Sequence, residues 1–148
     1  METPPKIRRF RLSDMDRIAA IESASFGRDA YDRNLFAEFF HKCGGLFLAA
    51  EWRGVVRGYC VSCTRGERAE IVSIAVEPAF RQHGIATSLM DSTLRRLRRR
   101  PVARVVLMVK VRNRPARLFY EKYGFEKVRL VRGYYENGAD GILMSREL

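Results

Sequence analysis

The sequence contains few of the side chains that build metal centres. It has two histidines, His41 and His83, and three cysteines among 148 residues. The histidines lie far apart and follow no ligand spacing, whereas a structural zinc ion needs about four such ligands, so we expect no metal. Cys60 and Cys63 lie in an extended segment where they would point to opposite faces, and Cys43 makes the number odd. We expect all three cysteines to be reduced packing residues.

Long apolar segments are absent as well. No stretch approaches the ~20 apolar residues that span a bilayer, and the N-terminus lacks the basic and then apolar pattern of a secretory signal. We therefore expect a cytoplasmic chain without a membrane partner. A chain of 148 residues, 47% of them hydrophobic, can bury one core. Because no repeat, linker or low-complexity segment interrupts it, we expect a single domain over residues 1–148.

Acidic residues are in the minority. Lys and Arg number 28 against 17 Asp and Glu, which gives a formal net charge of +11. This excess favours an anionic partner such as nucleic acid, an acidic membrane or a polyphosphate ligand, and charge alone does not choose among them. Residues 95–100 hold part of the excess, at a place that suits the negative end of a helix dipole and also suits RNA. No nucleic-acid-binding motif accompanies this run, so we do not expect a nucleic acid to be required.

Hydrophobic periodicity predicts an α+β order of elements. Apolar residues at helical spacing follow Ser13, which is expected to be a helix N-cap. Runs of β-branched and aromatic residues between turn residues are typical of strands. The predicted helices cover residues 13–26, 31–42, 84–99 and 113–123, and the predicted strands cover residues 6–11, 46–51, 55–64, 69–76, 103–111, 125–131 and 141–144.

The segment from Ile74 to Ala86 carries the most chemical information. Pro78 ends a strand, because proline has no N–H to donate, and Gly84 permits close backbone approach just before a helix. A helix N-terminus presents unpaired N–H groups and a positive dipole end to an anion, and Arg81 adds a charge. An ordinary strand-to-helix turn with a solvated arginine explains the same residues. Taken alone, the segment leaves a phosphate site and a plain turn both open.

Three blocks of residues resemble the GNAT superfamily of acetyltransferases. Val76-Glu77-Pro78 followed by Arg81-Gln82-His83-Gly84-Ile85-Ala86-Thr87 resembles its V-x-P-x-x-R/Q-x-x-G-x-G/A motif, which binds the CoA pyrophosphate. Residues 107–125 resemble the L-E-V-R-x-x-N-x-x-A and L-Y-E-K-x-G-F blocks of the N-terminal-amine branch, which includes the ribosomal-protein-alanine enzymes. Residues 133–140 resemble its G-Y-Y-x-x-G-x-D segment. The blocks cover most of residues 70–145 in the family's order, and the N-terminal third matches only in general layout.

The resemblance implies a GNAT fold and an acetyl-CoA site. The fold has a mixed, mostly antiparallel sheet flanked by helices, splayed between the strands predicted at 69–76 and 103–111 to admit the pantetheine arm. Backbone N–H groups of about residues 82–86 would hold the pyrophosphate. Ile74 and Val76 would pair with the arm through their main chain. The residues that the resemblance assigns to the acetyl-CoA site are Ile74, Ala75, Val76, Arg81, Gln82, His83, Gly84, Ile85, Ala86, Thr87, Asn113 and Tyr120.

Acetyl transfer from a thioester needs a neutral amine and a proton for the departing thiolate. The family places a tyrosine near the CoA sulfur at the position of Tyr120, which implies a general acid there. Met108 departs from the family, which usually has a glutamate base at this place. Glu70 resembles the catalytic glutamate of the histone-acetylating branch, and partial burial would raise its pKa, so we expect it to be the base. The alternative is a strand-end residue that faces water, in which case a water-mediated base would serve an α-amine. Asn113 is a helix N-cap, a CoA contact or both.

The resemblance implies direct transfer of acetyl to the α-amine of a protein N-terminus, with ribosomal proteins among the candidate acceptors. Tyr134 and Tyr135 lie in a loop that covers the peptide N-terminus in this branch, and Phe26 and Tyr31 would form the opposite wall. Packing at strand ends explains the paired tyrosines equally well. The alternatives are a lysine or small-molecule amine as acceptor, or a basic nucleic-acid-binding protein with a degenerate acyl-CoA site. The sequence does not indicate an oligomeric state.

Overall fold

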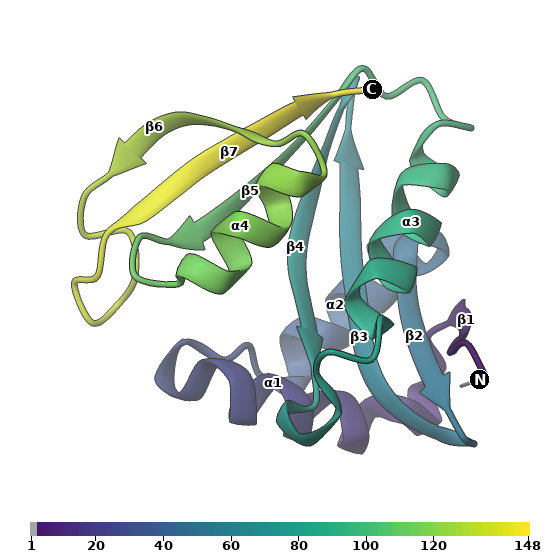
Figure 1. Ribbon diagram of the computed structural model, residues 1–148. Coiled ribbons are helices and arrows are strands. Elements are labelled where there is room, and N and C mark those ends of the chain that lie inside the picture. The colour runs from purple at the N-terminus through teal and green to yellow at the C-terminus, as the bar shows by residue number, and fades with distance from the viewer. Residues whose placement is uncertain (1–2) are drawn as a thin grey trace. The chain divides into compact units, whose positions relative to one another are not determined.

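A computed structural model describes residues 3–148 (Figure 1). Its contacts form two compact units, the first made of residues 3–63 with Ile71–Arg100 and the second of Thr64–Glu70 with Pro101–Leu148. Every predicted helix and strand is present, with ends shifted by a few residues. The α-helices are α1 (Met15–Phe26), α2 (Arg33–Cys43), α3 (Ile85–Leu97) and α4 (Arg114–Lys122), and the strands are β1 (Lys6–Arg9), β2 (Phe47–Trp52), β3 (Val55–Arg65), β4 (Arg68–Val76), β5 (Arg104–Lys110), β6 (Glu126–Val131) and β7 (Gly141–Glu147).

In the first unit, the strands run in the order β1-β2-β3-β4, and β2 pairs antiparallel with both β1 and β3. Helix α3 lies on one face of these strands and α1 and α2 lie on the other (Figure 1). Alternate residues of β3 serve the two faces: Tyr59 and Val61 join the aromatic cluster under α1 and α2, whereas the Cys60 thiol accepts a hydrogen bond from Thr93 of α3 (3.4 Å). Burial on both faces explains the nearly continuous apolar runs of β2 and β3.

In the second unit, the strands run in the order β5-β7-β6, and both pairs are antiparallel. Strand β5 buries Val105, Val106, Leu107 and Val109, which occupy both of its faces, while β6 is largely exposed along its length. Lys127 and Arg129 lie on this exposed strand, where charged side chains discourage pairing with another chain.

Helix α1 begins later than the sequence predicts. We expected Ser13 to be its N-cap, but a 3-10 turn precedes the helix and α1 starts at Met15. The Asp14 carboxylate accepts hydrogen bonds from the backbone N–H of Arg11 (2.8 Å) and from the guanidinium of Arg8 (2.8 and 2.9 Å). This ion pair and the turn, rather than a serine cap, determine where the helix begins.

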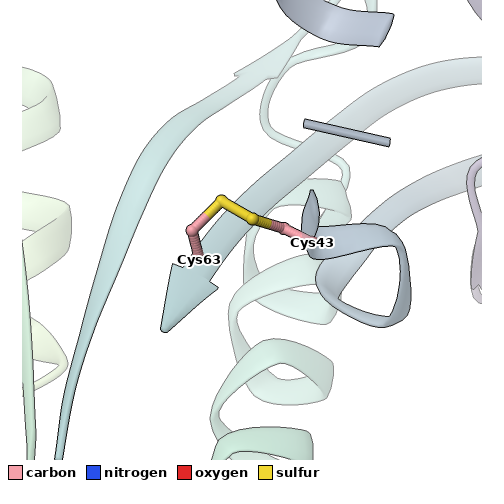
Figure 2. The surroundings of a disulfide bond; sticks show 2 residues. All are labelled: Cys43 and Cys63. Carbon is pink, nitrogen blue, oxygen red and sulfur yellow. A yellow bond between two sulfur atoms is a disulfide. The ribbon is translucent and has the colours of Figure 1, made fainter. Parts of the chain in front are cut away.

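A disulfide joins Cys43 at the end of α2 to Cys63 on β3, with 5.2 Å between the Cα atoms (Figure 2). The prediction that all three cysteines are reduced is therefore wrong for this pair. Cys60 and Cys63 do point to opposite faces of β3. Because α2 covers the face on which Cys63 lies, Cys43 at the end of α2 is close enough to bond with it. Cys60 is the buried free thiol, and burial raises its pKa to about 11.

Candidate active site

The turn between β4 and α3 brings the predicted pyrophosphate-binding residues together in the first unit. After the 3-10 turn Pro78–Phe80, Gln82 (φ 69°) and Gly84 (φ 78°) both take left-handed backbone conformations. This conformation is costly for a residue with a side chain, and such strain concentrates at ligand sites. Turns of this kind gather successive backbone N–H groups into a concave surface that suits an anion.

The N-terminus of α3 adds further amide groups to this turn. The first bond of the helix runs from the Ser88 N–H to the Gly84 carbonyl (3.0 Å). The N–H groups of Ile85 and Ala86 precede that bond, so they have no carbonyl one turn back in the helix. The helix dipole makes this end positive. The backbone therefore has the form of an anion site, and the contact of each residue with CoA stays a prediction.

Aromatic and cationic side chains that the sequence reasoning missed hold the turn in place. The Trp52 ring lies 4.8 Å from the His83 ring and 5.6 Å from the Phe80 ring, centroid to centroid. The guanidinium carbon of Arg57 lies 3.9 Å above the Phe80 ring, which is cation–π geometry. Nothing in the local sequence around Trp52 indicates this role, because its partners lie about 30 residues further along the chain.

Glu77 anchors the same turn to the strands beneath it. Its carboxylate is 2.7 Å from the guanidinium of Arg17 and 2.8 Å from that of Arg57, and its N–H donates to the Arg57 carbonyl (2.7 Å). Partial burial would raise the pKa of Glu77, but the hydrogen bonds from Arg57 and Arg17 outweigh it and the pKa lies below its usual value. The residue before Pro78 thus has a structural role that its position in the motif did not indicate.

Arg81 connects the turn to α1. Its Nε donates to the Val76 carbonyl (3.3 Å), and one terminal nitrogen lies 3.4 Å from the Ser25 hydroxyl. The charge expected at the phosphate turn is present, and its guanidinium is directed toward the end of α1.

A buried polar cluster in the first unit was also missed. Glu22 of α1 is 1% exposed, and its Oε1 accepts hydrogen bonds from the hydroxyls of Tyr59 and Ser73 (2.9 Å for Ser73). Its Oε2 accepts from the backbone N–H of Tyr31 (3.0 Å). Burial, followed by the charge of Glu22, raises the pKa of Tyr59 far above its ordinary value. One carboxylate thereby connects β3, β4 and the segment that follows α1.

That segment carries Phe26 and Tyr31, the residues predicted to form one wall of the acceptor site. Both are half-buried and pack against the aromatic core of the unit. The Tyr31 ring meets the rings of Phe36 and Phe39 edge to face, at centroid distances of 6.3 and 5.9 Å. Their packing is established, and their contact with an acceptor stays a prediction.

In the second unit, α4 positions Tyr120. The Asn113 side chain accepts a hydrogen bond from the Ala116 N–H (3.2 Å), which confirms the predicted N-cap. Tyr120 is 8% exposed, and its ring lies 6.0 Å from that of Phe125. Its carbonyl accepts from the Phe125 N–H (3.1 Å), so the chain turns back under the tyrosine. Tyr120 is a buried tyrosine at a defined place, and its role as acid stays a prediction.

Met108 and the paired tyrosines lie together in the second unit. A Cβ built on Gly141 would lie 3.0 Å from the Met108 sulfur and 3.3 Å from the Tyr134 Cβ, so all three converge. Tyr134 is 49% exposed, and its ring centroid lies 4.9 Å from that of Tyr135. The Lys110 ammonium lies 5.1 Å from the Tyr135 ring centroid. A pocket of 190 Å³ at the end of β5 is lined by Lys110, Val111, Arg112, Gly138, Ala139 and Asp140.

Glu70 does not have the environment that the sequence predicts. We expected partial burial near the sheet centre, but Glu70 is exposed. Alternation along β4 buries Ala69 and Ile71, and Glu70 points to the opposite side close to the β3–β4 turn. Its assignment as base stays a prediction, now without the support of desolvation.

Residues 3–148 contain neither a cluster of metal-binding side chains nor a helix that could span a membrane. No group of three or more histidine, cysteine, aspartate or glutamate side chains in this part of the chain could hold a metal ion. None of its helices is both long and apolar enough to cross a membrane.

Comparisons with known proteins agree along nearly the whole chain. The family model described as Acetyltransferase (GNAT) family matches residues 12–125. An N-alpha-acetyltransferase of Sulfolobus acidocaldarius is 34% identical over 158 aligned positions, which cover 97% of this chain and 92% of the relative.

Solved structures give the same result for the fold. The crystal structure of Ard1 from Thermoplasma volcanium superposes with a TM-score of 0.95 at 27% identity and covers 99% of each chain. The ribosomal-protein-S18-alanine N-acetyltransferase from Escherichia coli superposes with a TM-score of 0.84 at 23% identity, over 97% of this chain and 93% of that one. The predicted fold class, α+β with a mixed, mostly antiparallel sheet, is confirmed. The chain belongs to the GNAT family and is an acetyl-CoA-dependent N-acetyltransferase related to the N-terminal acetyltransferases.

Proposed function

We propose that this enzyme acetylates the α-amine at the N-terminus of a protein. The observation that carries the proposal is the strained anion-binding turn of residues 82–84, in a chain that aligns over 97% of its length with an N-alpha-acetyltransferase. Partly exposed paired tyrosines at the end of β5 add support, because aromatic side chains with polar tips suit the binding of a peptide.

In the proposed reaction, the CoA pyrophosphate binds the β4–α3 turn. The neutral amine attacks the thioester carbonyl carbon, so that a C–N bond forms and the C–S bond then breaks. Tyr120 gives its hydroxyl proton to the departing thiolate and regains one from solvent. The proton lost by the amine passes to Glu70 or to water. No covalent intermediate with the enzyme is needed.

The lack of a glutamate at Met108 favours an α-amine over lysine. A protein α-amine has a pKa of ~7.7 to 8.0, so a sizeable fraction is already neutral near pH 7.5, whereas a lysine with a pKa of ~10.4 requires roughly 4 kcal/mol to lose its proton. A methionine cannot accept that proton, and Glu70 is exposed. A reaction that needs only a weak base fits these side chains better.

We also propose a cytoplasmic location and ribosomal proteins as candidate acceptors. The E. coli enzyme of similar fold acts on ribosomal protein S18, which motivates that acceptor class. The disulfide is a point against the location, because cytosolic thiols are generally kept reduced. Cellular fractionation followed by thiol labelling without reductant tests the location and the redox state together.

Thiol release from acetyl-CoA tests the acceptor class. Peptides with a free N-terminus and no lysine are compared with N-blocked peptides that contain lysine. We expect release with the first set only. Release with the blocked lysine peptides only would contradict the proposal and favour lysine as the acceptor, and release with neither set would favour a small-molecule amine.

The role of Tyr120 is tested with a matched pair of variants. Tyr120→Phe removes the proposed acid and is expected to lower kcat about 10²-fold or more, because a positioned acid typically contributes that much. Tyr123→Phe makes the same chemical change at the residue that follows α4 and should retain most of the activity. Equal rates for the Tyr120→Phe variant and the original enzyme across the pH range would remove Tyr120 as the acid.

A further inference from the structure

A dense group of arginines lies at the C-terminal end of α3. Arg95 and Arg96 are in the last turn of the helix, and Arg98, Arg99 and Arg100 follow it. All are exposed except Arg96, which is half-buried. Arg9 of β1 is near enough to affect Arg96: burial, and then the charges of Arg9 and of the other arginines, lower the Arg96 pKa. The group is therefore a cluster in space and more than a run in sequence.

The cluster extends to the end of α2. A Cβ built on Gly45 would lie 2.9 Å from the Arg100 guanidinium, so this side chain reaches the turn that follows α2. His41 and Lys42 occupy the last turn of α2 and are exposed. We define the basic patch by these members: Arg9, His41, Lys42, Arg95, Arg96, Arg98, Arg99 and Arg100.

Within the described part of the chain, no carboxylate lies at ion-pair distance from the arginines of the patch. Elsewhere in the first unit Arg8, Arg17 and Arg57 each lie within 2.8 Å of an acidic oxygen. Within residues 3–148, the arginines of the patch form no ion pair; Arg95 donates to the Ser92 hydroxyl at 3.0 Å. The like charges repel one another, and no ion pair among the described residues compensates them, so an external anion would relieve the repulsion.

Neither acetyl-CoA nor the helix dipole accounts for the patch. The phosphate turn is at the other end of α3, and a helix of 13 residues is about 20 Å long. One pyrophosphate therefore does not reach both ends. The dipole is complemented within the last turn, where Arg95 and Arg96 suffice, and its effect does not require the three arginines beyond the helix.

We propose that the basic patch binds the phosphodiester backbone of nucleic acid. Guanidinium groups match phosphate oxygens with two parallel hydrogen bonds, and binding of this kind is independent of sequence. An anionic membrane is the less suitable partner, since peripheral membrane segments combine basic and apolar side chains. The exposed large apolar residues of the described chain lie outside 41–42 and 95–100. The inference is independent of the acceptor class proposed above.

Fluorescence anisotropy with a labelled RNA hairpin and a DNA duplex tests the proposal. If about five phosphates are contacted, affinity falls about 5 × 10²-fold between 50 and 200 mM salt. Binding of both nucleic acids is the expected result, because the recognised group is the shared backbone. Binding of vesicles rich in phosphatidylserine with neither nucleic acid bound would overturn the proposal in favour of a membrane.

Two variants with the same change in net charge separate the patch from general attraction. The patch variant carries Arg98→Gln, Arg99→Gln and Arg100→Gln; the control carries Lys127→Gln, Arg129→Gln and Arg132→Gln at exposed positions in and after β6. The patch variant should lose affinity at least tenfold and reduce the slope of log affinity against log salt by about 2 to 3. Equal losses in both variants would overturn the proposal. Unchanged acetylation of a short peptide by the patch variant shows that its fold is retained.

Discussion

At the scale of single residues, Glu22 is the clearest case of a side chain whose removal has several consequences. Its buried carboxylate accepts hydrogen bonds from the hydroxyls of Tyr59 and Ser73 and from the backbone N–H of Tyr31. Glu22→Ala removes the acceptor of all three donors; the Tyr59 and Ser73 hydroxyls lie 3.1 Å apart and can pair with each other, which leaves one hydroxyl proton and the Tyr31 N–H without this acceptor. Each buried unsatisfied group costs about 1 to 3 kcal/mol. We expect a loss of at least 2 kcal/mol in the free energy of unfolding, measured by urea denaturation.

A control and a second readout distinguish this role from a general effect of lost charge. Glu38 lies exposed on α2, and Glu38→Ala should change stability by less than about 0.5 kcal/mol. Because Glu22 holds Tyr31, the Glu22 variant should also raise KM for the acceptor peptide more than KM for acetyl-CoA. Comparable losses of stability in the two variants would contradict the role given to Glu22.

Glu22 also illustrates what sequence reasoning can and cannot find. It follows Ile18 by four residues, so helical spacing already places it on the apolar face of α1. That position is a signal that a buried carboxylate needs partners. The partners themselves are 37 and 51 residues further along the chain, and no local pattern identifies them.

At the scale of elements, the left-handed backbone at Gly84 is a requirement of the turn between β4 and α3. Gly84→Ala forces a Cβ into φ 78°, at a cost of about 1 to 2 kcal/mol. A Cβ there meets nothing within 4 Å, so the change acts through the backbone alone. We expect a higher KM for acetyl-CoA together with lower stability.

Gly66→Ala is the matched control for this prediction. Gly66 (φ 62°) lies in the turn between β3 and β4, and a Cβ there also meets nothing within 4 Å. Both variants should lose similar stability, while only Gly84→Ala should raise KM for acetyl-CoA. The same increase in KM from Gly66→Ala would show that the effect belongs to stability and not to the turn.

The Cys43–Cys63 disulfide stabilises the protein by joining two elements, α2 and β3. It closes a loop with a sequence separation of 20 residues between α2 and β3, for which the chain-entropy estimate is about 3 kcal/mol. Cys43→Ala with Cys63→Ala should lower Tm in oxidising buffer by a corresponding amount. Adding reductant should lower the Tm of the original protein and leave that of the double variant unchanged. An unchanged Tm after verified reduction would contradict this stabilisation.

Helices and strands were predicted well because their signals are local. The β-branched apolar run of β5 and the apolar spacing in α3 depend on neighbouring residues, and Asn113 caps α4 through a contact only three residues away. The incorrect expectations depend on contacts between different elements, some of them distant in sequence. Asp14 forms an ion pair with Arg8 on another element, and Cys43 forms a disulfide with Cys63. The exposure of Glu70 depends on how β4 packs.

At the scale of the whole molecule, the excess of basic residues determines how stability responds to acid. The structure holds Asp14, Glu51 and Glu77 with their pKa values lowered: burial opposes the shift at Asp14 and Glu77, and hydrogen bonds from arginines outweigh it. At Glu51, the hydrogen bond from Arg8 is the largest cause. With a net charge of +11 at neutral pH, protonation of these groups also increases self-repulsion.

A carboxylate with a lowered pKa in the folded state contributes stability above its unfolded pKa, and that contribution is lost as pH falls through the folded value. The ordinary pKa values are 3.8 for Asp14 and 4.5 for Glu51, so stability should be nearly constant above about pH 5 and decline below it.

Arg8→Gln removes the partner of both carboxylates and should lower the free energy of unfolding by on the order of 3 kcal/mol at pH 7. The difference from the original protein should shrink as pH falls, because protonated carboxyls no longer need Arg8. Arg33→Gln, which affects an exposed pair with Asp16, should change little at any pH. Urea midpoints from pH 3 to pH 7 provide the measurement, and a difference that stays constant with pH would mean that Arg8 stabilises the fold by packing and not by charge.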